Sequence, residues 1–191
     1  MPITDEYEEK YHKAEVNSLL SPQIKAVCGK ILVNKKRYQE VELKTNIPWY
    51  LIGCIHYRES SLDFDRHFAN GDPLFSWNGK ALKTIHEPKD LGPYKCWQDS
   101  AIDILSKKKY GKLETLGDQL LFAEKYNGFG YYKKGVMSPY LWAGTSLYSG
   151  GKYVKDGVYD PKSFDKQLGV VCLLKCLLAF DQSTKRKDQN P

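Results

Sequence analysis

No stretch of this sequence is apolar over enough residues to cross a membrane. The longest apolar run, near residues 170–180, is interrupted by Lys175, whereas a spanning helix needs about 20 predominantly apolar residues. The first thirteen residues are acidic and polar and lack the apolar core of a secretory signal peptide. We therefore expect synthesis in the cytoplasm without a signal peptide, and no stable membrane insertion.

The cysteines are odd in number and do not form a disulfide framework. The chain has five cysteines, and without a secretion signal an odd count favours reduced thiols. Cys172 and Cys176 lie four residues apart, which suits small buried side chains on one face of an apolar helix. No further ligands accompany them at zinc-site spacing, so we expect neither a metal nor another cofactor.

The chain also lacks nucleic-acid-binding motifs, although its net charge is +6. A positive charge favours an anionic partner, which is a nucleic acid, a membrane surface or an acidic cell-wall polymer. No zinc-finger or single-strand-binding motif accompanies the charge, so we expect no nucleic-acid partner. Without internal repeats, 191 residues are most simply one domain and a monomer. We place that domain at residues 1–180, and expect the polar residues 181–191 to be disordered.

The most informative segment runs from Pro48 to Ser61. Pro48 suits the first turn of a helix, where its missing N–H costs nothing. The helical period then places Glu59 on the same face as Ile52 and Ile55. A carboxyl on an apolar face should have a raised pKa, and a glycosidase needs such a protonated acid to donate to the leaving oxygen. A buried glutamate paired with an arginine or a tyrosine hydroxyl explains the pattern equally well.

The remaining pattern predicts a mainly α (α+β) fold. The segment after Glu59 carries two strong turn signals, Asn70-Gly71-Asp72-Pro73 and Asn78-Gly79, between short aromatic and β-branched pieces. We predict a small irregular β-hairpin region there, over residues 63–93. Residues 34–46 have mixed charge and predict a helix end or a loop. The predicted helices cover residues 4–20, 21–32, 48–61, 97–106, 115–126 and 163–180.

Several short motifs resemble those of lysozyme-superfamily peptidoglycan hydrolases, which include lytic transglycosylases and goose-type lysozymes. The segment from His56 to Phe64 resembles their Glu-Ser signature, and the segment from Glu124 to Tyr131 is similar to their later Tyr-Asn-x-Gly motif. The resemblance to bacterial and phage-type members covers roughly residues 26–178. Its ordered motifs are Arg58-Glu59-Ser60-Ser61, Asn70-Gly71-Asp72-Pro73-Leu74, Tyr126-Asn127-Gly128, Ser138-Pro139-Tyr140-Leu141-Trp142 and Gly151-Lys152-Tyr153-Val154.

This resemblance implies a lysozyme-like fold and a peptidoglycan substrate. Glu59 matches the catalytic acid, which protonates the bond between N-acetylmuramic acid and N-acetylglucosamine. Tyr126 and Asn127 match a substrate-binding pair, and an Asn amide offers both a donor and an acceptor to an acetamido group. Asn127-Gly128 also forms an ordinary helix stop. The chain lacks the Gly-Leu-Met-Gln type of stretch that follows the acid in many lytic transglycosylases.

A hydrolase of this kind normally needs a second carboxylate. Asp63, Asp65 and Asp72 are the candidates, and we favour Asp72 because a hairpin turn can fold back over a cleft. Asp in a turn is equally well explained by turn chemistry. Thr84 is a candidate for positioning a water molecule or the substrate. Without a second carboxylate, a lytic transglycosylase is preferred, because that reaction uses the sugar's own groups and one acid/base residue.

Aromatic residues form the last candidate feature. They make up 13% of the chain, and such side chains either pack the core or present amphipathic surface to ligands. We predict that Trp142 contacts the glycan, with Tyr140, Tyr148 and Tyr153 as further candidates for the groove. The function predicted is an endolysin-like muramidase acting at the bacterial cell wall. The alternatives are a lytic transglycosylase and a non-catalytic glycan-binding domain of the same fold.

Overall fold

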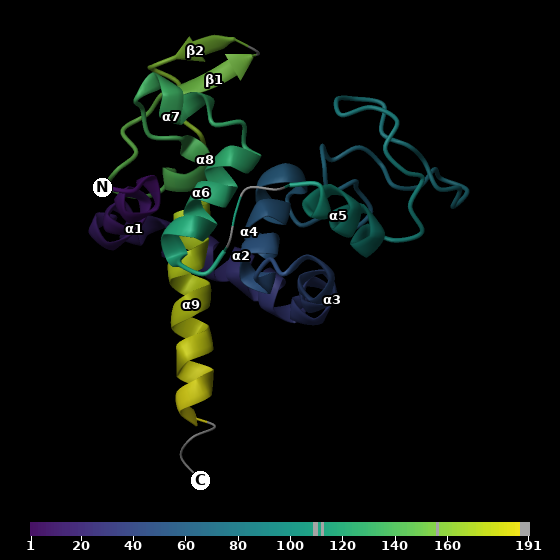
Figure 1. Cartoon of the computed structure of the whole chain (residues 1–191), viewed down its shortest axis with the longest axis horizontal. Helices are drawn as coiled ribbons and strands as arrows, with labels where there is room; N and C mark the ends of the chain where they lie inside the picture. Colours follow the sequence, from purple (N-terminus) through teal and green to yellow (C-terminus); the bar gives the residue numbers. More distant parts are fainter. Residues whose placement is uncertain (109–110, 112, 156, 188–191) are drawn as a thin grey trace. The chain divides into compact units, whose positions relative to one another are not determined.

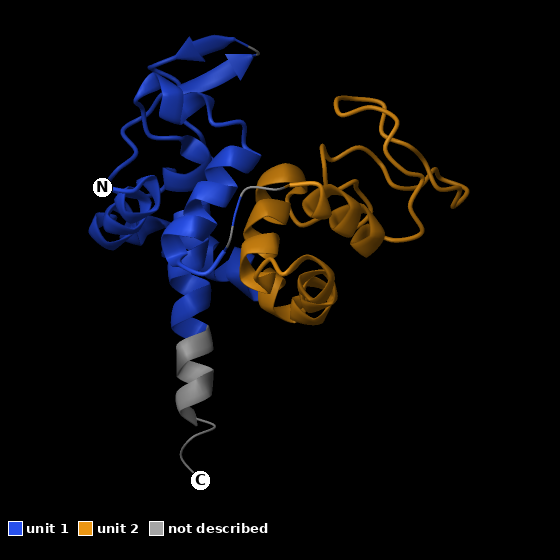
Figure 2. Ribbon diagram, in the orientation of Figure 1, with its two compact units in different colours: residues 1–29, 110–191 blue, residues 30–109 orange. Residues whose placement is uncertain are grey.

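The computed structural model describes residues 1–108, 111, 113–155 and 157–187. This described part is mainly helical, with one two-stranded antiparallel sheet (Figure 1), as the sequence predicts at the level of fold class. The chain divides into two compact units, one of residues 30–109 and one of residues 1–29 with 110–191 (Figure 2). The single domain predicted for residues 1–180 stays a prediction.

The unit formed by the two chain ends is a group of packed helices. Within it, α1 packs against α6, and α8 packs against both α6 and α9. Gly117 in α6 permits the first contact, because a Cβ atom there would lie 2.1 Å from the carbonyl oxygen of Thr4 in α1. The helices of this unit are α1 (Ile3–Lys13), η1 (Ser18–Leu20), most of α2 (Ser21–Val33), α6 (Leu116–Tyr126), α7 (Gly130–Lys134), α8 (Pro139–Trp142) and α9 (Val170–Lys187).

The small sheet belongs to the same unit. Strand β1 (Lys152–Lys155) pairs antiparallel with β2 (Val158–Asp160), with Tyr153 opposite Tyr159. The Tyr131 side chain from α7 supports the sheet, because its hydroxyl accepts a hydrogen bond from the N–H of Tyr153 at 2.9 Å. The three tyrosine rings meet edge to face, with centroids 5.0–6.3 Å apart. Aromatic packing therefore holds the sheet to α7.

The unit of residues 30–109 is built on α3 (Lys35–Thr45), which packs against α4 (Trp49–Ser60) and α5 (Trp97–Ser106). His56 lies at its centre, fully buried, with Nδ1 3.0 Å from the Tyr38 hydroxyl and Nε2 3.1 Å from the carbonyl oxygen of Asp63. Burial lowers the pKa of His56 to about 4. The aromatic rings around it are those of Tyr38, Phe64, Phe68 and Trp97.

Four predicted helices are confirmed almost to the residue. They are α2, α4, α5 and α6, and α6 starts after Thr115, whose side chain forms a capping box with Asp118. The loop or helix end predicted for residues 34–46 is wrong, because α3 occupies Lys35–Thr45. Its mixed charges lie on the exposed faces, while Tyr38 and Val41 are fully buried and supply the packing contact.

The two ends of the chain also differ from prediction. The first helix ends at Lys13 instead of continuing to residue 20, and a separate 3-10 turn covers Ser18–Leu20. The last helix begins at Val170 instead of residue 163, because Asp165 folds the preceding segment into a turn by accepting the N–H of Gln167 at 3.0 Å. It continues to Lys187; the disorder predicted for residues 181–191 stays a prediction, and residues 188–191 lie outside the described residues.

The predicted β-hairpin region is found only as turns and isolated bridges. Single antiparallel bridges join Arg66 to Pro73 and Phe75 to Ala81, and the segment between α4 and α5 is drawn as loop (Figure 1). Proline at one bridge position removes a ladder donor. Some main-chain N–H groups of this region are paired with the side chains of Asp72 and Thr84, as described below.

Candidate functional site

Glu59 lies in the last turn of α4, where the helix emerges from the core. The side chains from Leu51 to Tyr57 are all buried, whereas Arg58 and Glu59 are partly exposed. After them, Ser61 adopts the left-handed conformation that ends the helix. Glu59 therefore sits at the boundary between an apolar core and solvent, which is the position that the sequence predicts. Its raised pKa stays a prediction.

The turn Asn70–Asp72 packs beside the end of this helix. A Cβ atom on Gly71 would lie 3.2 Å from the main-chain oxygen of Glu59, and the φ of Gly71 is +74°. Glycine is therefore favoured here both by backbone conformation and by the close approach. The turn that carries Asp72 is thus held against the backbone of the residue predicted to be the catalytic acid.

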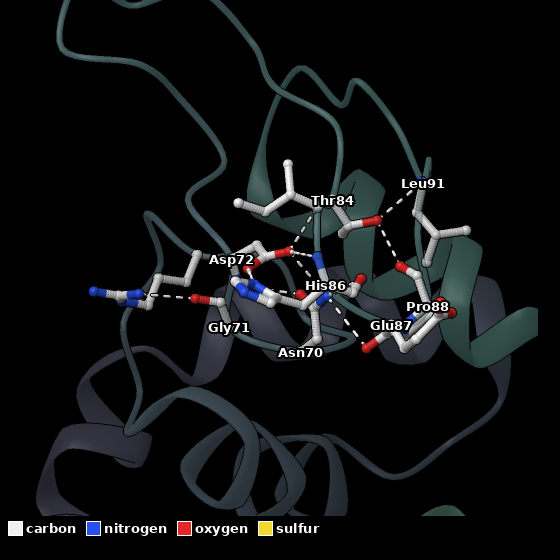
Figure 3. Close-up of polar contacts among 10 residues, drawn as sticks. Asn70, Gly71, Asp72, Thr84, His86, Glu87, Pro88 and Leu91 are labelled. Atoms are coloured by element: carbon white, nitrogen blue, oxygen red, sulfur yellow. Dashed lines mark hydrogen bonds and ion pairs between the residues drawn. The ribbon is translucent and has the colours of Figure 1, made fainter.

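The Asp72 carboxylate is almost completely engaged in organising this loop (Figure 3). One oxygen, Oδ2, accepts the main-chain N–H groups of Ile85 and His86 at 2.8 and 2.9 Å and the Asn70 side-chain amide at 3.0 Å. The other oxygen, Oδ1, lies 2.6 Å from Nδ1 of His86. Burial alone would raise the pKa of Asp72, but the hydrogen bonds from His86 and Ile85 outweigh it and hold the pKa well below its usual range.

This arrangement bears directly on the second carboxylate. Asp72 is buried and ionised, and it accepts four hydrogen bonds from three residues, three of them on one oxygen, which leaves little of the carboxylate for a substrate or a water molecule. The carboxylate joins the turn to residues thirteen and fourteen positions along the chain, so its contacts organise the loop. The catalytic assignment of Asp72 stays a prediction, and these hydrogen bonds favour the alternative, in which Asp72 has a structural role in the loop.

Thr84 belongs to the same loop network. Its hydroxyl donates to the carbonyl oxygen of Pro88 at 2.6 Å and accepts the N–H of Leu91 at 3.0 Å, and the side chain is buried (Figure 3). These two bonds use the hydroxyl's donor and one of its acceptor sites. Thr84 therefore closes the loop of residues 84–91, and its predicted role in positioning water or substrate stays a prediction.

His86 is a residue of this site that no sequence pattern indicates. Its side chain is 77% exposed although its Nδ1 is bonded to Asp72. A carboxylate that orients an exposed imidazole through Nδ1 leaves Nε2 directed away from the carboxylate and available to a ligand. The pairing depends on a contact across fourteen residues of loop, so sequence spacing gives no signal for it.

Tyr126 and Asn127 lie in the other unit, at the end of α6. Tyr126 is partly exposed and Asn127 is exposed. Asn127 borders an open pocket of about 520 Å³, a size in the range of small-molecule sites. The other lining residues come from α7, from the sheet and from the segments next to them, and they are Gly128, Gly130, Tyr131, Tyr153, Lys155 and Gly157.

This pocket brings together two of the sequence candidates. Asn127 was predicted as a substrate ligand and Tyr153 as a groove residue, and both line it. Tyr131 and Lys155 were not singled out from the sequence. The pocket thus offers aromatic surface, an amide and an ammonium group.

Trp142 and Tyr140 occupy a different environment. Trp142 is 2% exposed, and its ring stacks on Tyr7 of α1 with centroids 6.5 Å apart. Tyr140 is buried as well. A ring enclosed in this way offers no face to a sugar, so the position of Trp142 favours a core role over the predicted glycan contact.

Glu124 is the most unusual titratable group of this unit. It is 2% exposed in α6, and its Oε1 is a buried oxygen with no hydrogen-bond partner in the part of the chain that the structure describes. Burial raises the pKa of Glu124 to about 7, against the opposing hydrogen bond from Ser138 and the positive charge of Lys10. Sequence reasoning used Glu124 only as part of a motif and missed this property.

Two features are absent from the described residues. They contain no group of three or more His, Cys, Asp or Glu side chains placed to hold a metal ion. None of the helices that the structure describes has both the length and the apolar character needed to cross a membrane.

Comparisons of the chain with protein-family models, curated proteins and solved structures found no match.

Proposed function

We propose that this chain is a peptidoglycan hydrolase of the lysozyme type, an endolysin-like muramidase. It cleaves the β-1,4 bond between N-acetylmuramic acid and N-acetylglucosamine, with Glu59 as the general acid. The observation that carries the proposal is the place of Glu59, partly exposed in the last turn of a helix that is buried from Leu51 to Tyr57. An acid at the border of an apolar core can keep its proton and still reach a substrate.

Two other features support this proposal. The pocket beside Asn127 combines an amide with tyrosine rings, groups that suit the acetamido substituent and the apolar face of an N-acetylated sugar. The net charge of +6 favours adsorption to the anionic cell wall. The proposed partner is therefore the glycan strand of peptidoglycan.

A lytic transglycosylase is the second candidate, and the state of Asp72 favours it. The Asp72 carboxylate already accepts hydrogen bonds from Asn70, Ile85 and His86. A transglycosylase needs no second carboxylate, because the substrate's own groups complete the reaction after protonation by Glu59. A non-catalytic glycan-binding domain is a third reading, in which Glu59 has no chemical role.

The decisive experiment compares Glu59→Gln with the native chain on purified peptidoglycan. Loss of lysis with retained binding supports catalysis by Glu59, because glutamine keeps the shape of the side chain but cannot donate a carboxyl proton. Glu87→Gln, at an exposed glutamate of the same unit, is the matched control and should lyse normally. Full lysis by Glu59→Gln would reject the proposal.

Product analysis separates the two reactions. Mass spectrometry of the released fragments gives reducing ends for a hydrolase and anhydromuramic ends for a transglycosylase. Asp72→Asn adds a second readout, since it keeps the oxygen that faces the loop but removes the charge. A hydrolase that uses Asp72 loses activity at unchanged folding, whereas a transglycosylase keeps its activity if the variant remains folded by circular dichroism.

A further inference from the structure

The most exposed large apolar side chain lies at the tip of a turn between α4 and α5. Trp77 is 98% exposed and has no ring contact among the described residues. An indole ring in water forgoes the free energy of burying it, and its amphipathic face is open to a ligand that can stack on it.

The turn that carries Trp77 is held firmly. The N–H of Ser76 donates to the carbonyl oxygen of Lys80 at 2.9 Å, and the N–H of Gly79 donates to that of Ser76 at 2.9 Å. The Ser76 hydroxyl accepts the N–H of Lys80 at 3.1 Å and donates to Oδ1 of Asn78 at 2.5 Å. A ligand therefore meets a ring whose backbone is already ordered, which reduces the entropy lost on binding.

The groups beside the ring are polar. Asn78 uses Oδ1 as an acceptor within the turn, and none of the described contacts uses its amide N–H donors. A flat aromatic face beside amide donors suits a pyranose ring, which offers an apolar face and polar substituents. A lipid surface favours several neighbouring apolar side chains, whereas here the flanking residues are Ser76, Asn78 and Gly79.

The charge of the turn adds a second requirement. Lys80 and Lys83 are exposed, and residues 73–86 contain no Asp or Glu. Neither lysine forms an ion pair with any described residue. A local excess of positive charge favours an acidic ligand and makes its binding sensitive to salt.

From these observations we propose that Trp77, Asn78 and the two lysines form a surface site for an anionic, N-acetylated wall glycan. The site holds polymeric substrate by stacking a sugar ring on the indole of Trp77 and by attracting acidic groups to Lys80 and Lys83. The choice of wall glycan as the ligand rests on the proposed function. The site itself lies on and beside the turn of residues 76–80 and does not include the residues proposed for catalysis.

The experiment measures pelleting of the full chain with purified, insoluble peptidoglycan sacculi, in a Glu59→Gln background so that the ligand is not degraded. Trp77→Ala should bind about thirtyfold more weakly, for roughly 80 Å² of ring surface removed from water in the complex. Trp77→Phe should recover most of the binding. Leu43→Ala removes another exposed apolar side chain of the same unit, 80% exposed on α3, and should bind like the parent.

The lysines are tested by the joint variant Lys80→Gln and Lys83→Gln. It should bind more weakly than the parent at low salt and equally at high salt, because screening removes the contribution of exposed charges. Vesicles containing phosphatidylglycerol are the competing probe. Trp77-dependent binding to vesicles without Trp77-dependent binding to sacculi overturns the proposal in favour of a lipid ligand.

Equal binding of Trp77→Ala and the parent to sacculi also overturns the proposal, as does an equal loss in Leu43→Ala. These results are independent of the catalytic test. If the native chain fails to lyse sacculi but binds them through Trp77, the proposed catalysis is wrong and the surface site stands. If it lyses them and Trp77→Ala binds normally, the surface site is wrong and the catalysis stands.

Discussion

The buried carboxyl of Glu124 should contribute less and less to the stability of the protein as pH rises from about 4.5 to 7. Its pKa in the folded chain is about 7, against an ordinary value of 4.5. Between these values the folded chain holds a proton that the unfolded chain has released, so each rise in pH favours unfolding. The stability contributed by the protonated form is complete below pH 4.5 and is lost once the pH exceeds about 7.

The size of the effect follows from the shift. A change of one pKa unit corresponds to about 1.4 kcal/mol, so the contribution of Glu124 to the free energy of unfolding should fall by about 3 kcal/mol across this interval. Solvent hardly screens the charge of Glu124, because this residue is 2% exposed, so screening does not reduce the effect much. A loss of this size is a large part of the 5–15 kcal/mol that typically stabilises a folded protein.

His56 acts in the opposite direction over nearly the same interval. Its pKa is lowered by burial from 6.5 to about 4, so its contribution to stability is present above pH 6.5 and is lost as pH falls toward 4. The two slopes nearly cancel between pH 4.5 and 6.5 in the native chain. Removing one of the two groups should therefore reveal the other.

Glu124→Gln removes the acid and keeps its volume. We expect the free energy of unfolding of this variant, minus that of the native chain, to increase by about 3 kcal/mol between pH 4.5 and 7.5 and then to stay constant. The assay is urea unfolding followed by far-UV circular dichroism at half-unit steps of pH. The change with pH is the quantity to compare, because any cost of burying the new amide is the same at every pH and cancels.

Glu87→Gln, at a side chain that is 82% exposed, serves as the control and should show no such increase. A difference between Glu124→Gln and the native chain that is constant with pH would refute the reasoning, because it would mean that Glu124 titrates alike in the folded and unfolded chains. The variant alone should gain stability as pH rises from 4.5 to 6.5, which reports His56.

Three further predictions concern packing and loops. Trp142→Ala should reduce the free energy of unfolding by about 3–5 kcal/mol in urea titrations, since the ring is buried; a loss below about 1 kcal/mol would indicate a ring that is not part of the core. Asp72→Ala should lower stability by about 2–4 kcal/mol at neutral pH, because two partly buried main-chain N–H groups lose a charged acceptor, and the deficit relative to the native chain should shrink in strong acid, where the native carboxylate is protonated as well. Gly151→Ala should destabilise the sheet, because φ is +91° and the new Cβ would lie 1.9 Å from the Tyr159 hydroxyl; normal thermal unfolding of this variant would contradict that packing.

Local sequence signals were sufficient where one short segment determines its own conformation. Local patterns predict three features that the structure contains: the helix over residues 115–126, the turns at Asn70-Gly71 and Asn78-Gly79, and the helix after Pro48. Local signals did not predict helix α3, because its packing depends on only a few buried positions among many charged ones. The predicted hairpin strands are not found, because the side chains of Asp72 and Thr84 form hydrogen bonds with backbone groups that would otherwise pair between strands.

The same distinction between local signals and long-range contacts applies to the candidate site. That Glu59 ends a buried helix can be read from helical periodicity alone, and its partial exposure agrees with that reading. The state of Asp72 cannot be read in this way, because its partners at positions 85 and 86 approach only when the loop has folded. The sequence could not separate the aromatic residues either: Trp142 is enclosed by helices and Trp77 is left in water.

By itself, the sequence determined the mainly helical class, the positions of α4, α5 and α6, and the placement of a carboxyl at the end of an apolar helix. These depend on interactions within a few residues of one another, which periodicity and capping report. Only the tertiary structure decided which carboxyls are buried, which are bonded and which tryptophan reaches solvent. Burial and long-range hydrogen bonds arise from segments that are distant in sequence, so no local pattern specifies them.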